Sequence, residues 1–123
     1  MKIACPVNSN DLNNLCLNQS FGRAPYFYIY DDESKEGYIT KNEGMSSPHG
    51  AGIKAAQIVV DTKAKVVIAY RCGDAALLVL KEAGIELFGP ISNNPKDNII
   101  AYQAGTLSVI DEIHSGHNNR PDQ

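Results

Sequence analysis

The periodicity of the apolar residues changes near the middle of the chain. Residues 24–32 alternate, with tyrosines on one face and Phe27 and Ile29 on the other, which is typical of a β-strand. From Gly50 onward, apolar residues recur at helical spacing, and short continuous apolar runs separate these segments. The pattern predicts an α/β protein that begins as a β-meander and continues as alternating strands and helices.

Eight segments carry these two patterns. The predicted strands are residues 2–7, 24–32, 38–43, 65–70 and 85–89, and the predicted helices are residues 50–63, 74–84 and 95–104. Asp74 is placed to cap the second helix, and Gly84 is placed to end it. The third helix has Asn94 as its predicted N-cap and Pro95 at its first position.

The order of these segments restricts the sheet topology. Strands joined through a helix require right-handed crossovers and pair in parallel, whereas the first half forms a hairpin. The simplest closed solution places the first strand in the middle, with the hairpin on one side and the two later strands on the other. We therefore predict a five-stranded mixed sheet of order 3-2-1-4-5 in which strand 2 alone is antiparallel.

This topology gathers four loops at one edge of the sheet, because strands 1, 3, 4 and 5 all point the same way. The loops are residues 8–24, 44–50, 71–74 and 90–94. The last three lead directly into helix N-termini, where unpaired N–H groups and the positive end of the helix dipole favour an anion. Open α/β sheets also generally bind ligands at this edge.

The residues in these loops are the candidate ligand-binding residues. Glycines let a backbone approach a ligand closely, and an imidazole and a thiolate suit the softer metals. The candidates are Gly22, Arg23, Gly50, Gly52, Arg71 and Gly73 for ligand contacts, with Asn93 in the fourth loop, and His49 and Cys72 for metal.

Ordinary structural roles remain open for the same residues. The glycines also fit a role in turns and close packing, and His49 fits an exposed position at a helix start. Cys72 also fits a small buried residue at a strand end, and Cys5, within a strand, is predicted to lie in the core.

Composition limits the class of protein. A chain of 123 residues with 43% hydrophobic residues fits one domain, which we predict over residues 1–113, followed by a disordered polar tail at residues 114–123. The net charge of −3, without a block of lysines or arginines, argues against a nucleic-acid partner. No apolar run approaches the roughly 20 residues of a membrane helix, so we expect a cytoplasmic protein. Three widely spaced cysteines argue against a disulfide framework and a structural zinc site.

Two blocks of residues resemble a known family. They are SFGRAPYFYIYD at residues 20–31 and HGAGIKAAQIVVD at residues 49–61, accompanied by KIACPV near the start and LKEAGIELF at residues 80–88. On these residues the chain resembles the dinitrogenase iron-molybdenum cofactor biosynthesis family, which includes domains of nitrogenase accessory factors. The resemblance covers residues 1 to about 107.

The resemblance implies a ribonuclease-H-like, three-layer α/β/α architecture. It also implies non-catalytic binding or carriage of a metal–sulfur cluster of iron and/or molybdenum, with cluster donor or acceptor proteins as partners. His49, Gly50 and Gly52 match the second block, and Gly22 and Arg23 match the first. Many relatives have a histidine where this chain has Ser20, so a two-histidine site is not expected. The remaining alternatives are ligation by His49 and Cys72, or binding of the cluster by charge and N–H groups alone.

Other functions stay open at this point. A regulatory module that binds a small anion or a nucleotide would use the same helix ends, although the chain has neither a P-loop nor a GxGxxG motif. A hydrolase would need several carboxylates that converge on metal ions, and Asp31, Asp32 and Asp74 lie at opposite strand ends. We therefore expect no enzyme activity, and a monomer or weak dimer.

Overall fold

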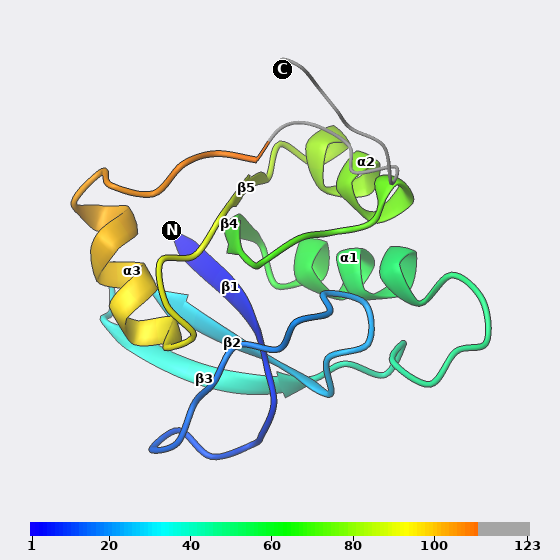
Figure 1. Cartoon of the computed structure of the whole chain (residues 1–123), viewed down its shortest axis with the longest axis horizontal. Helices are drawn as coiled ribbons and strands as arrows, with labels where there is room; N and C mark the ends of the chain where they lie inside the picture. The colour runs from blue at the N-terminus through cyan, green and yellow to red at the C-terminus, as the bar shows by residue number, and fades with distance from the viewer. Residues whose placement is uncertain (111–123) are drawn as a thin grey trace.

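A mixed sheet of five strands runs through the middle of the molecule (Figure 1). The computed structural model describes residues 1–110, so the predicted tail at residues 114–123 and the predicted domain end at residue 113 lie outside the described residues. The strands are β1 (Lys2–Val7), β2 (Tyr26–Asp31), β3 (Glu36–Lys41), β4 (Ala64–Ile68) and β5 (Glu86–Phe88).

The sheet has the predicted topology. Its order is β3-β2-β1-β4-β5. Strand β2 is antiparallel to both of its neighbours, whereas β1, β4 and β5 are parallel to one another. The prediction of one antiparallel strand in the order 3-2-1-4-5 is therefore confirmed.

Three helices complete the fold: α1 (Ala51–Asp61), α2 (Asp74–Glu82) and α3 (Pro95–Gln103). Helices α1 and α2 lie side by side on one face of the sheet, and α3 covers the other face (Figure 1). The molecule thus has three layers, in agreement with the predicted α/β/α architecture. In the described part of the chain, no helix is long and apolar enough to cross a membrane.

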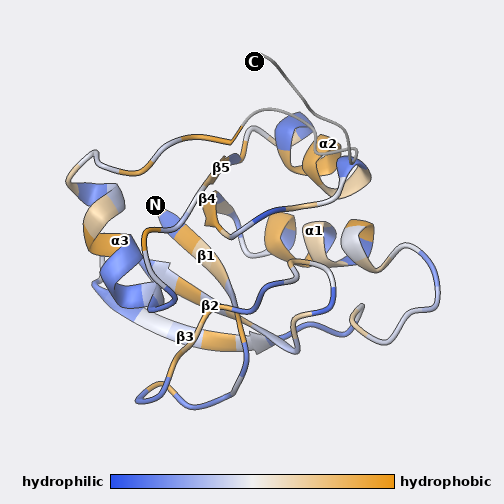
Figure 2. Cartoon of the chain, in the orientation of Figure 1, coloured by the Kyte–Doolittle hydropathy of each residue, from blue (hydrophilic) through white to orange (hydrophobic). Residues whose placement is uncertain are grey.

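The alternation of side chains along the strands separates two cores. In β1, Ala4 packs with α1 and α2, whereas Ile3 and Cys5 pack on the side of α3. Figure 2 shows this strand as hydrophobic along most of its length, as expected for a strand that is covered on both faces. The predicted core position of Cys5 is confirmed, because its exposed fraction is 0%.

The cores differ in the size of their side chains. The first cluster joins small residues of α1, such as Ala55 and Ala56, to Leu77 and Leu80 of α2. Small side chains allow the two helices to approach each other closely. The second cluster is richer in tyrosines, including Tyr28 from β2, and Ile99 closes it from α3.

Most helix and strand ends differ from the predictions by one or two residues, and at two starts the structure shows the local cause. Strand β3 begins at Glu36 instead of residue 38, because the turn before it closes early through a hydrogen bond from Lys35 N to Asp31 O (2.8 Å). Asp74 is not the cap of α2: Gly73 is the N-cap, no side chain caps the helix, and Asp74 occupies the first helical position.

Two other predicted end signals are confirmed. The Asn94 side chain caps α3 by accepting hydrogen bonds from Lys96 N (2.9 Å) and Asp97 N (3.3 Å). Gly84, with φ of 76°, follows the last turn of α2. Only a residue that tolerates the left-handed region ends a helix in this way.

The two leucines Leu78 and Leu80 provide a test of the first core. Leu80 is fully buried between α2 and the sheet, whereas Leu78 on the same helix is 52% exposed. We expect Leu80→Ala to lower the free energy of unfolding by about 3 kcal/mol, because it removes buried apolar surface and leaves a cavity. The matched variant Leu78→Ala should lower it by less than about 0.5 kcal/mol. Urea unfolding followed by circular dichroism measures both, and equal losses would contradict the assigned packing.

Candidate functional site

A shallow pocket lies at the predicted edge of the sheet, where three segments distant in the sequence meet. We call it the helix-end pocket; it has a volume of about 390 Å³ and is open to solvent. Its lining residues are Ser20, Gly22, Arg23, Gly50, Ala51, Gly52, Ile53, Gly73, Asp74, Ala75 and Ala76. The fold thus brings together five of the predicted ligand-contact residues: Gly22, Arg23, Gly50, Gly52 and Gly73.

Two uncapped helix N-termini face this pocket. The N-cap of α1 is Gly50, which has φ of 72° and no side chain to accept a hydrogen bond. The N-cap of α2 is Gly73, and this helix also has no side-chain cap. The first N–H groups of both helices therefore remain available, and they carry the partial positive charge of a helix N-terminus.

The third helix does not contribute to this pocket, contrary to the prediction that three helix ends share it. Helix α3 covers the opposite face of the sheet, and its own Asn94 already caps it. The loop before α3 instead binds the loop after β1, because Leu17 N donates a hydrogen bond to Asn93 O (2.8 Å). Asn93 is therefore not among the pocket residues.

A close approach between two backbones forms one wall of the pocket. A Cβ atom added to Gly22 would lie 2.9 Å from Gly52 Cα and 3.0 Å from Gly52 N. Both are backbone atoms, which cannot rotate away as a side chain would. Only glycine at position 22 lets this loop lie against the first turn of α1.

The buried side chain of Asn42 fixes two of the loops relative to each other. Its Nδ2 atom donates hydrogen bonds to Gly22 O (3.1 Å) and Ala24 O (2.8 Å), while its Oδ1 atom accepts one from Gly44 N (3.1 Å). The exposed fraction of this residue is 0%. Sequence reasoning missed Asn42, although an asparagine two residues before a glycine at a strand end is a recognised turn signal.

Arg23 binds the protein itself. Its Nη1 atom donates hydrogen bonds to Met45 O (2.8 Å) and Ser47 O (2.7 Å) in the loop that leads to α1. Lys54 supports the same loop through a hydrogen bond from its Nζ atom to Ser47 Oγ (3.0 Å). The guanidinium thus lines the pocket and also holds the loop that carries His49.

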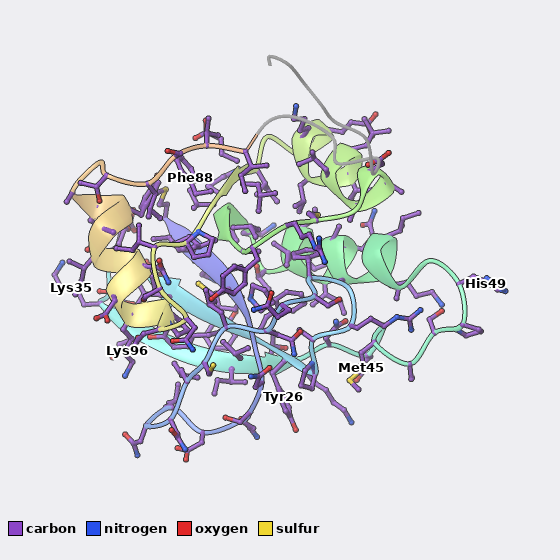
Figure 3. The ribbon with its side chains drawn as sticks, viewed as in Figure 1. Tyr26, Lys35, Met45, His49, Phe88 and Lys96 are labelled. Atoms are coloured by element: carbon purple, nitrogen blue, oxygen red, sulfur yellow. The ribbon has the colours of Figure 1, made fainter. Side chains whose placement is uncertain are left out.

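Neither of the two predicted metal ligands lines the pocket. His49 is exposed, and Figure 3 shows its side chain pointing outward from the far end of its loop. Cys72 is 4% exposed and belongs to the apolar cluster that includes Phe21 and Ala76. Each is adjacent in sequence to a residue that lines the pocket, Gly50 or Gly73 respectively.

Burial has a chemical consequence for Cys72. Loss of solvent raises the pKa of its thiol to about 12. A helix N-terminus favours the thiolate form of a nearby cysteine, but desolvation dominates here. At neutral pH the side chain is therefore a thiol, and a metal has to displace its proton in order to bind it.

The remaining predicted residues are more dispersed. Arg71 is exposed and does not line the pocket. Ser20 does line it, and its Oγ atom accepts a hydrogen bond from Arg23 N (3.0 Å). Over residues 1–110, no group of three or more His, Cys, Asp or Glu side chains could hold a metal ion.

Comparisons with known proteins place this geometry in context. Residues 1–105 match the family model described as dinitrogenase iron-molybdenum cofactor. The apo form of the orange protein from Desulfovibrio gigas superposes with a TM-score of 0.82 at 24% identity, covering 89% of this chain and 92% of that one. A provisionally assigned NifB protein from Thermotoga gives 0.80 at 28% identity, with coverages of 94% and 98%.

A more distant structure has the same fold. A provisionally assigned dinitrogenase from Methanocaldococcus jannaschii gives a TM-score of 0.69 at 20% identity, covering 91% of this chain and 96% of that one. A search of curated proteins finds no match.

Gly22 and Gly73 form a matched pair of tests for this site. We expect Gly22→Ala to lower the free energy of unfolding by about 1 to 3 kcal/mol, because its Cβ atom would push the first turn of α1 away. Nothing lies within 4 Å of a Cβ atom on Gly73, so Gly73→Ala should cost only the preference for glycine over alanine at an N-cap, about 0.5 kcal/mol.

Urea unfolding gives the two stabilities, and amide chemical shifts report the position of the first turn of α1. Shifts at residues 51–53 should move in Gly22→Ala alone. Equal stability of both variants, with unchanged shifts, would contradict the close approach.

Proposed function

This chain belongs to the dinitrogenase iron-molybdenum cofactor family, and we propose that it binds an anionic metal–sulfur cluster in the helix-end pocket and carries it without catalysing a reaction. The cluster, of iron and/or molybdenum with sulfide, is the cargo. Cluster donor or acceptor proteins are the corresponding partners, and the open form of the pocket is compatible with transfer between proteins.

The observation that carries this proposal is the pair of uncapped helix N-termini at one pocket. Assemblies of iron or molybdenum with sulfide are commonly anionic, and helix N-termini bind anions through their N–H groups. Gly22, Gly50, Gly52 and Gly73 leave these N–H groups uncovered by side chains. A bulky anion can therefore approach both helix ends at once.

Direct bonds to metal would come from His49 and Cys72 in this proposal. The His49 imidazole is exposed, and its loop would have to move to bring it over the pocket. The Cys72 thiol is buried in the first core cluster. A metal of the cluster can replace the thiol proton, which an anion without metal cannot do. Arg71, exposed beside Cys72, adds positive charge at this end.

One charge in the pocket opposes an anion. Asp74 lines the pocket from the first position of α2, where its carboxylate interacts favourably with the helix dipole and so stabilises the helix. Replacing this carboxylate by an amide should therefore affect folding and binding in opposite directions. Asp74→Asn is expected to lower stability by about 0.5 kcal/mol and to tighten binding of the cluster.

A second candidate function is a regulatory module that binds a small anion or a nucleotide without metal. Backbone N–H groups recognise negative charge whatever its source, and the described residues offer no group of three potential metal-binding side chains. A phosphate-dependent rise in melting temperature, without retention of metal and sulfide, would favour this candidate.

Anaerobic reconstitution with iron, molybdate and sulfide tests the cluster proposal. The native protein should retain metal and sulfide in a fixed ratio through desalting, with an absorption band in the visible range. Ala75→Glu should weaken this retention at least about tenfold, because a second carboxylate would repel the anion at the end of α2. The added carboxylate interacts favourably with the helix dipole, so the free energy of unfolding should not fall.

Leu78→Glu is the matched control, since Leu78 is exposed on the same helix but outside the pocket. Its retention should equal that of the native protein. A native protein that retains no metal, or an Ala75→Glu variant that retains as much as the native protein, would contradict binding at this pocket.

The proposed ligands have a separate test. We expect His49→Ala and Cys72→Ser each to shift the visible band and to release metal more rapidly to a chelator, because each removes one bond to the cluster. Both spectra and release rates are measured on the reconstituted variants. Unchanged values in both would remove these side chains from the ligand set and leave binding by N–H groups alone.

A further inference from the structure

A second pocket lies on the face of the sheet that carries α3, between this helix and the β2–β3 hairpin. We call it the hairpin pocket; it has a volume of about 410 Å³, within the usual range for small-molecule sites. Tyr28, Ile99 and Ile100 provide apolar walls, and Lys35 and Lys96 contribute the charged groups. Figure 3 shows both lysines on the side of the molecule opposite to His49.

The hollow depends on a glycine within a strand. Gly37 lies in β3, and the ring of Tyr28 from β2 packs directly over it. A Cβ atom added to Gly37 would lie 2.6 Å from Tyr28 Cε1. Any other residue at position 37 would displace the ring and occupy part of the pocket. A glycine in a strand interior costs stability. Here its missing side chain leaves room for the tyrosine ring and for the pocket beside it.

The charge of this pocket differs from that of the whole chain. The net charge of the protein is −3, yet the pocket has two lysines and no carboxylate among its lining residues. The Lys96 ammonium donates a hydrogen bond to Leu12 O (3.3 Å), and that of Lys35 donates one to Asp32 O (3.5 Å). Within residues 1–110, neither lysine forms an ion pair.

Both lysines occupy positions that local structure disfavours. Lys35 has φ of 61°, in the left-handed region where glycine or asparagine is preferred. Lys96 lies in the first turn of α3, where a cation opposes the helix dipole. Both residues nevertheless line the same pocket.

We propose that the hairpin pocket binds a small organic anion with an aromatic body, such as a benzoate-type carboxylate. The aromatic ring would lie against Tyr28 and Ile99, and the carboxylate would accept charge-assisted hydrogen bonds from the two ammonium groups. A neutral analogue lacks these bonds, and a cationic analogue is repelled. This site is independent of the helix-end pocket and of its cargo.

Amide chemical shifts with 4-hydroxybenzoate as the probe test the proposal, with 4-hydroxybenzyl alcohol as its neutral analogue. The carboxylate should shift the amides of residues 35, 37, 96 and 103, and should bind about tenfold more tightly than the alcohol. The double variant Lys35→Asn with Lys96→Gln should lose this preference. Asparagine tolerates the left-handed backbone of residue 35 better than lysine, and glutamine removes the charge that opposes the dipole of α3. The melting temperature of the double variant should therefore not fall.

A second variant separates charge from folding. Ile100→Glu places a carboxylate at the wall of the pocket, and Ile100 is already 64% exposed. It should weaken 4-hydroxybenzoate binding at least about tenfold. Ile91→Glu is the matched control, because Ile91 is 66% exposed and lies outside the pocket, and it should bind like the native protein.

Three outcomes would overturn the proposal: no shift of the pocket amides at about 10 mM probe, equal affinity for acid and alcohol, or unchanged binding by the double variant. Shifts confined to residues 51–53 and 73–76 would also overturn it, since they would assign the anion to the helix-end pocket.

Discussion

The central position of β1 is the constraint from which the rest of the structure follows. The strand pairs antiparallel with β2 on one side and parallel with β4 on the other, so the hairpin and the crossover units have to lie on opposite sides of it. Because β1 is buried on both faces, each face needs its own helical cover. The crossovers place α1 and α2 on one face, and α3 closes the other (Figure 1).

The same pairing determines where ligands can approach, because the loops that follow the parallel strands leave from one edge. Two buried asparagines then fix those loops. Asn42 binds the carbonyls of Gly22 and Ala24 beside the helix-end pocket. Asn98 accepts a hydrogen bond from Ile91 N (2.7 Å) and donates to Ser92 O (2.9 Å), which orders the loop before α3. Buried amides of this kind specify one loop arrangement, since each unpaired group would cost about 1 to 3 kcal/mol.

The sequence predicted features that depend on periodicity and on chain connectivity. Strand order, the helix positions to within two residues and the Asn94 cap belong to this class, because neighbouring residues carry their signals. The prediction that α3 contributes to the pocket was wrong. The ends of parallel strands share one edge of the sheet, but the helix that follows a strand can lie on either face, and the strand pattern does not say which. The roles of Asn42 and Gly22 depend on contacts about 20 or more residues apart, for which spacing gives no direct signal.

Under the proposed function, the Cys72 thiol would distinguish two kinds of anion. Helix N–H groups attract a phosphate and a metal–sulfur cluster by the same electrostatic force, and the Arg23 side chain donates hydrogen bonds to its own loop. Burial keeps Cys72 protonated at neutral pH, with a pKa of about 12, so a phosphate finds a neutral thiol next to the pocket. In the proposed complex a soft metal would displace that proton, and the raised pKa adds to the cost of the exchange. Under this proposal Cys72 therefore contributes to binding only when the ligand contains a metal, whereas the helix ends attract either anion.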